Sequence, residues 1–150
     1  MTAGEMCTRN VVVTRKEEGI VDAAKRMRMF HVGDVVVVER DGDHRRPIGI
    51  LTDRDIVLSV VASDPGYAHC CLVNDVMTSD PVTVRETEGF MDVLKKMQAH
   101  GVRRIPVVDD EGDLVGIVAF DDVARVLADE LNAMVGVLAS EHVREERYRT

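Results

Sequence analysis

The stretches GILTDRDIV (residues 49–57) and GIVAFDDVA (residues 116–124) are two copies of one pattern, in which a short apolar strand runs into the start of a helix. Asp55 of the first copy is matched by Asp122 of the second, whereas the position equivalent to Thr52 holds an alanine. A repeat that keeps its carboxylate and loses its hydroxyl indicates two related but unequal sites in one fold.

The repetition covers most of the chain. VTRKEEGIVDAAKRM (residues 13–27) aligns with TVRETEGFMDVLKKM (residues 83–97) at an offset of 70 residues, and the offset falls to 67 by the two stretches quoted above. The three extra residues of the first copy lie in the polar stretch RDGDHRRP (residues 40–47). Because a hairpin loop lengthens at little cost in free energy, we expect a solvated loop there, with Arg45 and Arg46 in water.

Each copy contains the same series of expected elements. A short Val/Thr-rich strand comes first, then an amphipathic helix, then two β runs joined by a polar turn, then the start of a second helix. The ranges are 11–13, 18–30, 35–38 and 48–52 in the first copy, and 82–84, 88–100, 105–108 and 114–119 in the second. A copy of about 60 residues buries too little surface to be stable alone. We therefore predict an α+β fold of tandem β-α-β-β-α repeats packed about a pseudo-two-fold axis.

The pattern divides the chain into four parts. We predict the first repeat at residues 1–62, a connector at 63–75, the second repeat at 76–130, and a long C-terminal helix with a charged tail at 131–150. LVNDVM, at the end of the connector, is predicted to form a short helix. An apolar stripe marks the C-terminal helix, whose last, charged stretch SEHVREERYRT is expected to fray.

Composition excludes several classes of protein. The net charge of −8 disfavours binding to nucleic acid phosphates, and 3% aromatic residues are too few for a surface that stacks bases. No apolar run approaches the roughly 20 residues of a membrane helix, and the N-terminus lacks the apolar segment of a signal peptide. The three cysteines form no disulfide framework, so we expect a cytoplasmic protein. No nucleophile–base pair, carboxylate pair or metal-ligand spacing stands out, so neither catalysis nor a metal site is expected.

The repeated motifs resemble a known family. DVMTSDPVTV (residues 75–84), GVRRIPVVDDEGDLVGIV (residues 101–118) and GILTDRDIV together look like a cystathionine-β-synthase (CBS) domain pair, or Bateman module. The resemblance covers about residues 5–130 and is to a stand-alone pair. It implies two clefts between the repeats that bind adenine nucleotides such as AMP, ADP or ATP, with S-adenosylmethionine or NAD as less expected ligands. No cofactor is implied as obligatory.

The resemblance also implies which residues bind. The Thr-x-x-Asp of one repeat would hold phosphate and ribose, and the first strand and the Gly-apolar-x-x-apolar-Pro segment of the other repeat would flank the adenine. Transferred to this chain, the expected binding residues are Thr52, Arg54, Asp55, Thr83, Val102, Arg103, Arg104, Ile105 and Asp122. Thr52 lies where a helix start favours an anion, and Asp55 can accept hydrogen bonds from ribose hydroxyls.

Each of these residues has a plainer interpretation. Thr52 and Asp55 match a helix capping box, and Asp122 suits a helix N-terminus without any ligand. Arg103 and Arg104 fit a solvated strand edge, and Arg54 fits a solvated helix surface. A threonine such as Thr83 is common in strands. Val102 and Ile105 are core residues by default.

Two functions follow as hypotheses. The first is a regulatory sensor, in which a bound adenine nucleotide shifts the population of arrangements of the two repeats and so alters a surface read by an effector protein. The resemblance implies that it acts as a homodimer, to which the apolar C-terminal stripe adds surface. The alternative is a structural or partner-binding module whose clefts are degenerate and bind no ligand.

Overall fold

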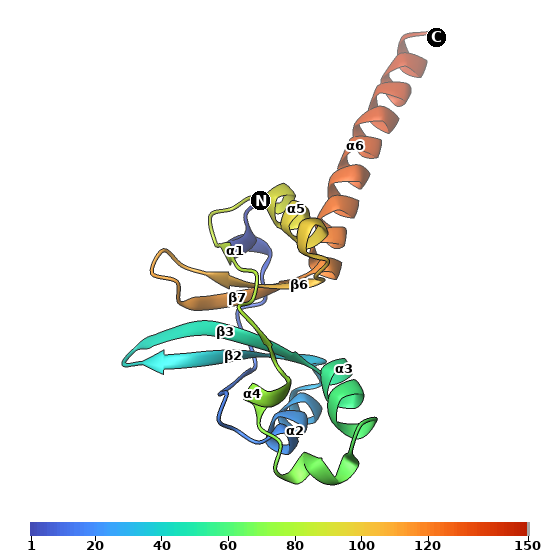
Figure 1. Ribbon diagram of the computed structural model, residues 1–150. Coiled ribbons are helices and arrows are strands. Elements are labelled where there is room, and N and C mark those ends of the chain that lie inside the picture. Colours follow the sequence, from blue (N-terminus) through green and yellow to red (C-terminus); the bar gives the residue numbers. More distant parts are fainter. Residues whose placement is uncertain (150) are drawn as a thin grey trace.

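The computed structural model describes residues 1–149 and shows the predicted β-α-β-β-α order twice (Figure 1). Unit 1 contains β1 (Val13–Thr14), α2 (Ile20–Phe30), β2 (Asp34–Asp41), β3 (His44–Thr52) and α3 (Asp53–Ile56), which continues as a π-helical turn (Val57–Val61) and, after a break, a 3-10 helix (Pro65–His69). Unit 2 contains β5 (Val84–Arg85), α5 (Phe90–His100), β6 (Arg104–Val108), β7 (Leu114–Ala119) and α6 (Phe120–Tyr148). The predicted α+β repeat fold is confirmed.

The two units pack through their sheets, with the hairpin β2–β3 facing the hairpin β6–β7 (Figure 1). Val35 and Val37 of β2 pack on the helices of unit 1, whereas Val36 and Val38 join Leu114 of unit 2 in a separate buried cluster. Alternate residues of a strand point to opposite faces, so the run of four valines is buried on both sides of its sheet. The core between the sheets is therefore what joins the repeats.

The opening segment of each repeat packs on the other unit. The N-terminal helix α1 (Ala3–Met6) lies on unit 2, where Ala3 N donates to Glu88 O at 2.7 Å. The equivalent helix α4 (Val73–Val76), which confirms the short helix expected from LVNDVM, lies on unit 1, where Val73 N donates to Glu18 O at 2.9 Å. The strand β4 (Thr78–Ser79) then completes the sheet β1-β2-β3-β4 of unit 1. These crossings tie the units together covalently and through backbone hydrogen bonds.

The polar stretch at residues 40–47 does not form the expected loop. The strands β2 and β3 extend through it and leave a turn of only two residues, Gly42 and Asp43. Arg45 is not in water: its backbone N donates to Asp113 Oδ1 at 2.8 Å and its guanidinium donates to Leu114 O at 3.3 Å. The prediction for Arg45 was wrong because the added residues lengthen the hairpin until its tip reaches the turn of unit 2.

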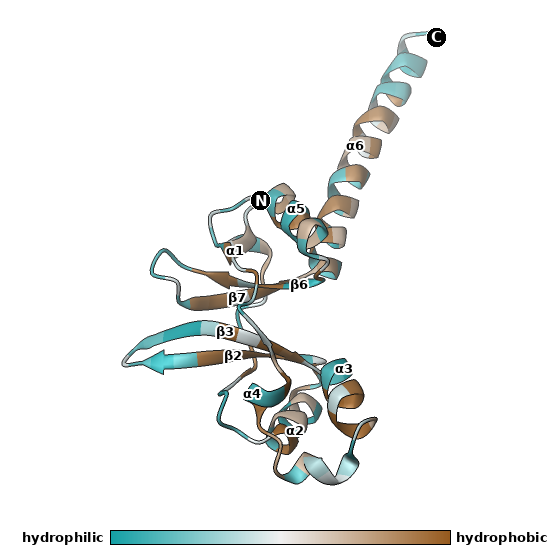
Figure 2. Ribbon diagram, in the orientation of Figure 1, coloured by the Kyte–Doolittle hydropathy of each residue, from teal (hydrophilic) through white to brown (hydrophobic). Residues whose placement is uncertain are grey.

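The helix α6 leaves the body of the molecule and projects away from it (Figure 1). It is helical through Tyr148, so the expected fraying of the charged tail is not observed. Of the residues in α6, only Val123 is buried, and hydrophobic residues recur along the projecting part (Figure 2). Within residues 1–149, every helix is too short or too polar to cross a lipid bilayer.

Glycine at position 116 is required by the N-terminal segment that crosses onto β7. A Cβ at this position would collide with Cys7 Sγ and would lie 3.1 Å from the carbonyl oxygen of Thr8. We predict that Gly116→Ala lowers the free energy of unfolding by about 1–3 kcal/mol, the usual cost of overpacking, measured by urea denaturation. The matched control is Gly136→Ala on the exposed surface of α6, where a Cβ meets no atom within 4 Å. It is expected to raise helix stability by up to about 1 kcal/mol. Equal effects at the two positions would contradict the close approach of Cys7.

Candidate functional site

A cavity of about 550 Å³ lies between the end of β3 in unit 1 and the segment that joins α5 to β6 in unit 2. Its lining brings together six of the nine expected binding residues from the two repeats. These are Thr52, Arg54, Asp55, Val102, Arg103 and Arg104. The volume is in the range of about 300–1,000 Å³ typical of small-molecule sites.

Thr52 and Asp55 form a reciprocal capping box at the start of α3. Thr52 N donates to Asp55 Oδ2 at 3.0 Å, and Asp55 N donates to Thr52 Oγ1 at 3.1 Å. Two groups stay available, because the Thr52 hydroxyl accepts here without donating its own proton, and Asp55 Oδ1 accepts no hydrogen bond from residues 1–149. The interpretation of Thr52 and Asp55 as a helix capping box is thus correct. The capping box leaves the Thr52 hydroxyl proton as a donor and Asp55 Oδ1 as an acceptor at the cavity.

A second, smaller cavity of about 180 Å³ lies at the equivalent position across the pseudo-two-fold axis. The two linings correspond residue by residue at the repeat offset, with Thr8, Asn10, Val12, Val32, Ala119 and Asp122 in place of Thr78, Asp80, Val82, Val102, Thr52 and Asp55. Asp122 keeps the carboxylate: Oδ2 accepts from Ala119 N at 2.9 Å, and Oδ1 lies 3.6 Å from Nη2 of Arg125, whose side chain is 71% exposed. The second cavity is smaller and lacks the hydroxyl of the first, because Ala119 stands in the place of Thr52.

Arg104 lines both cavities and is paired with its own repeat equivalent. Its Nε lies 2.9 Å from Asp34 Oδ1, and the Asp34 side chain is only 12% exposed. Burial raises the pKa of Asp34, the Arg104 guanidinium opposes that rise, and the nearby Asp53 carboxylate adds to it. Arg104 therefore neutralises a largely buried carboxylate, while its own side chain is 44% exposed, as the solvated-strand-edge interpretation expects.

The other two arginines are more accessible. The Arg103 guanidinium lies 5.5 Å from the centre of the Phe120 ring and 3.7 Å from Asp121 Oδ1, and its side chain is 76% exposed. Arg54 lines the large cavity, and among residues 1–149 its guanidinium makes no ion pair. Both can turn toward an anion at little cost, since an exposed ion pair contributes at most about 1 kcal/mol.

Three expected binding residues do not line the large cavity: Asp122 lines the smaller one, and the other two line neither. Thr83 lies in a separate hollow, with its carbonyl accepting from Lys96 Nζ at 3.1 Å, and Ile105 is fully buried in the core of unit 2. Successive residues of an extended chain point to opposite sides, so Val82 faces the cavity where Thr83 was expected. The same alternation turns Ile105 inward while Arg104 faces the cavity.

Several lining residues were not predicted. They are Ile50, Thr78, Asp80, Pro81, Val82, His100 and Gly101. The segment around Asp80 is equivalent to the one around Asn10 at the same offset of 70, but only Thr8 and Thr78 are identical between residues 2–10 and 72–80, so the sequence signal there is weak. His100 is the last residue of α5 and lines the cavity from there.

The Arg104–Asp34 pair gives a stability prediction. Arg104→Met keeps the packing of the stem but leaves the Asp34 carboxylate buried without its partner, at a cost of about 1–3 kcal/mol near neutral pH. Because the folded-state pKa of Asp34 is raised, its ionisation opposes folding as the pH rises through that pKa. The deficit of Arg104→Met should therefore shrink at acidic pH, where Asp34 is protonated with or without the arginine. Urea denaturation across pH measures this, with Arg103→Met as the exposed control; a deficit that stays constant with pH would exclude the pair as its cause.

The comparisons with known proteins agree with this geometry. A CBS domain model matches residues 3–62 and 73–129. An uncharacterised protein of Methanopyrus kandleri is 35% identical over 84% of this chain, which spans 62% of that relative's length. A CBS domain protein from Pyrobaculum aerophilum, solved in complex with AMP, is 28% identical with a TM-score of 0.71, over 81% of this chain and 89% of that one. The cytosolic domain of the Mg²⁺ channel MgtE, solved in complex with ATP, is 28% identical with a TM-score of 0.69, over 83% of this chain and 48% of that one. With two matched repeats that cover most of its length, the chain belongs to the CBS domain family.

Proposed function

We propose that this chain is a regulatory module that binds an adenine nucleotide in the large cavity between its two units. The observation that carries the proposal is the lining of that cavity, where a helix start with a free hydroxyl and a free carboxylate oxygen from unit 1 faces an aliphatic and basic segment from unit 2. The AMP and ATP bound by the two solved relatives support the class of ligand.

Each part of a nucleotide has a partner in this proposal. The phosphates lie at the start of α3, where the Thr52 hydroxyl donates and Arg103 and Arg54 supply mobile positive charge. The ribose hydroxyls donate to Asp55. The adenine, in a chain with so few aromatic residues, lies between aliphatic side chains, for which Ile50, Val82 and Val102 are placed.

Regulation follows from the position of the cavity. A ligand that contacts both units binds one relative arrangement of them better than others, and it shifts the population toward that arrangement. We propose that an effector protein reads the resulting change of surface. The smaller cavity has less room and fewer free donors and acceptors, so the two sites are expected to be unequal.

We further propose that the module is a homodimer, with the projecting part of α6 in the interface. Leu127, Leu131, Met134 and Leu138 follow one another at spacings of four, three and four residues, and all are at least 43% exposed. Apolar residues with this spacing form the contact between two long helices of a coiled coil. The same helix of a second copy of the chain presents an identical apolar stripe, so the two can pair.

The principal alternative is a ligand-free scaffold, favoured by the capping box in which Thr52 and Asp55 already satisfy each other. Thermal unfolding with AMP, ADP and ATP separates the two functions. A ligand at 100 times its dissociation constant stabilises the folded state by about 2.7 kcal/mol. If no adenine compound moves the unfolding midpoint, the chain is a scaffold.

The location of the site is tested by Asp55→Asn, which keeps an acceptor for the Thr52 N–H but loses the charge that binds ribose. We predict affinity weaker by about 10- to 100-fold for the best of the three nucleotides, measured by titration calorimetry. The matched control is Asp122→Asn in the smaller cavity, where no more than a small change is expected. The reverse result would move the nucleotide to the second cavity.

A further inference from the structure

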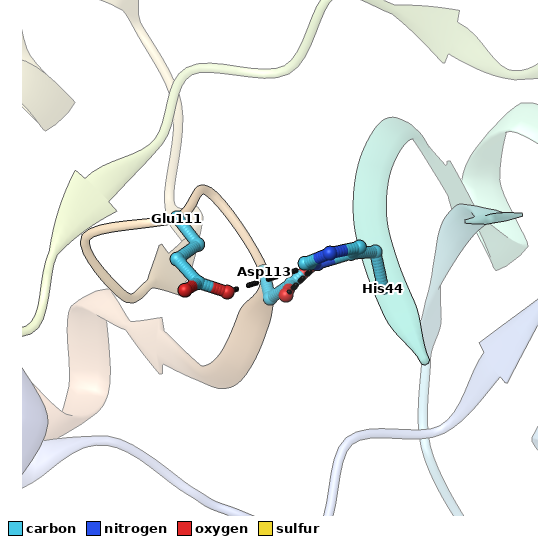
Figure 3. A group of neighbouring side chains, drawn as sticks. All are labelled: His44, Glu111 and Asp113. Atoms are coloured by element: carbon cyan, nitrogen blue, oxygen red, sulfur yellow. Dashed lines mark hydrogen bonds and ion pairs between the residues drawn. The ribbon is translucent and has the colours of Figure 1, made fainter. Parts of the chain in front are cut away.

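A histidine and two carboxylates meet where the tips of the two hairpins touch, at the opposite ends of β3 and β6 from the nucleotide cavity (Figure 3). His44 is the first residue of β3 in unit 1, and Glu111 and Asp113 belong to the turn between β6 and β7 in unit 2. His44 Nδ1 lies 2.7 Å from Asp113 Oδ2 and 3.8 Å from Glu111 Oε2. The three side chains each offer one ligand atom, and these atoms lie within 4.8 Å of one another.

The three donors match the ligands of a transition metal ion. Imidazole nitrogen combined with carboxylate oxygen suits Zn²⁺ better than Mg²⁺ or Ca²⁺, which prefer oxygen alone. Zinc bonds of about 2.0–2.1 Å at tetrahedral angles separate neighbouring ligand atoms by about 3.3 Å. The distances of 2.7 Å and 3.8 Å lie on either side of this value. Glu111, whose side chain is 71% exposed, can make most of the adjustment by rotation.

The two carboxylates are not used by the turn that carries them. Asp109 Oδ1 accepts from the backbone N of both Glu111 and Asp113 at 2.9 Å, so it already satisfies the turn. The Asp113 carboxylate is instead aimed across to unit 1, because Oδ1 accepts from Arg45 N at 2.8 Å while Oδ2 faces His44. A hydrogen bond that orients a ligating carboxylate in this way is a regular feature of metal sites.

His44 and Asp113 now share one short contact of 2.7 Å between the two hairpins. A divalent ion in the same place would gain the imidazole and both carboxylates as ligands.

We propose that His44, Glu111 and Asp113 form a binding site for a divalent transition metal ion, with Zn²⁺ the best match, which ties the hairpin of unit 1 to the turn of unit 2. The protein supplies three ligands and leaves at least one position of the ion to water, as in open zinc sites. The site is independent of the nucleotide proposal, since it shares no residue with either cavity between the units.

Titration of the metal-free full chain with Zn²⁺ by calorimetry, and with Co²⁺ by visible absorption, tests the site. We expect one saturable site per chain, which His44→Ala weakens by at least about 100-fold and Glu111→Gln by about 10-fold. Two matched controls should leave the affinity unchanged: Asp110→Asn, an acid in the same turn, and His69→Ala, a histidine on the 3-10 helix of unit 1. Circular dichroism of each variant establishes that it is folded.

Three results would overturn the proposal. The first is an absence of saturable Zn²⁺ binding, which would leave His44 and Asp113 as a plain ion pair. The second is unchanged affinity in folded His44→Ala. The third is loss of binding in Cys70→Ser, which removes an exposed thiol and would place the metal on the cysteines.

Discussion

The outer face of β2 has to be covered by a second sheet. Val36 and Val38 point away from the helices of their own unit, and they are buried in a cluster with Leu114 and Ile117 of unit 2 and with Val11 and Val13 beside them. An isolated unit would expose this apolar surface to water. Each aliphatic side chain so exposed would lose about 1.5–3 kcal/mol of the stabilisation that its burial provides. Face-to-face packing of the repeats is thus a condition for folding, and the cavities exist because this packing leaves room at the ends of the strands.

The pseudo-two-fold arrangement also explains how the cavities became unequal. Equivalent residues of the two repeats approach each other at the axis, which is why Asp34 and Arg104, one at each equivalent position, form an ion pair. Two arginines there would repel each other, and two aspartates would be buried without a counter-charge. Because Arg104 is paired with Asp34, Arg103 and Arg54 are the arginines that we propose as phosphate ligands. The charged pair at the axis therefore makes the repeats unequal in sequence, and the loss of the hydroxyl at Ala119 adds to this asymmetry.

The repeat pattern was enough to predict the β-α-β-β-α order and six of the 13 residues that line the large cavity, because both depend on local periodicity and on positions that recur between the repeats. Predictions failed where a side chain's direction or a long-range contact decided the outcome. Thr83 and Ile105 were placed one residue out of phase with the alternation of an extended chain. Arg45 was assigned to water because nothing local shows that its hairpin reaches the other unit. The group around His44 was missed for the same reason, since its members come from turns of different repeats.

The strands connect the two proposed binding places. β3 starts at His44 and ends at Thr52, and β6 starts at Arg104 and leads into the turn that holds Asp113, so each strand has the nucleotide cavity at one end and the metal site at the other. The eight steps along β3 span roughly 26 Å at about 3.3 Å per residue. A metal ion bound at the hairpin tips would restrict how the two units move relative to each other. A nucleotide in the cavity at the other end of the strands would favour one of the same relative arrangements. If the metal ion favours the nucleotide-bound arrangement, thermodynamic linkage requires the nucleotide to strengthen metal binding by the same factor, and if it favours another arrangement each ligand weakens the other equally.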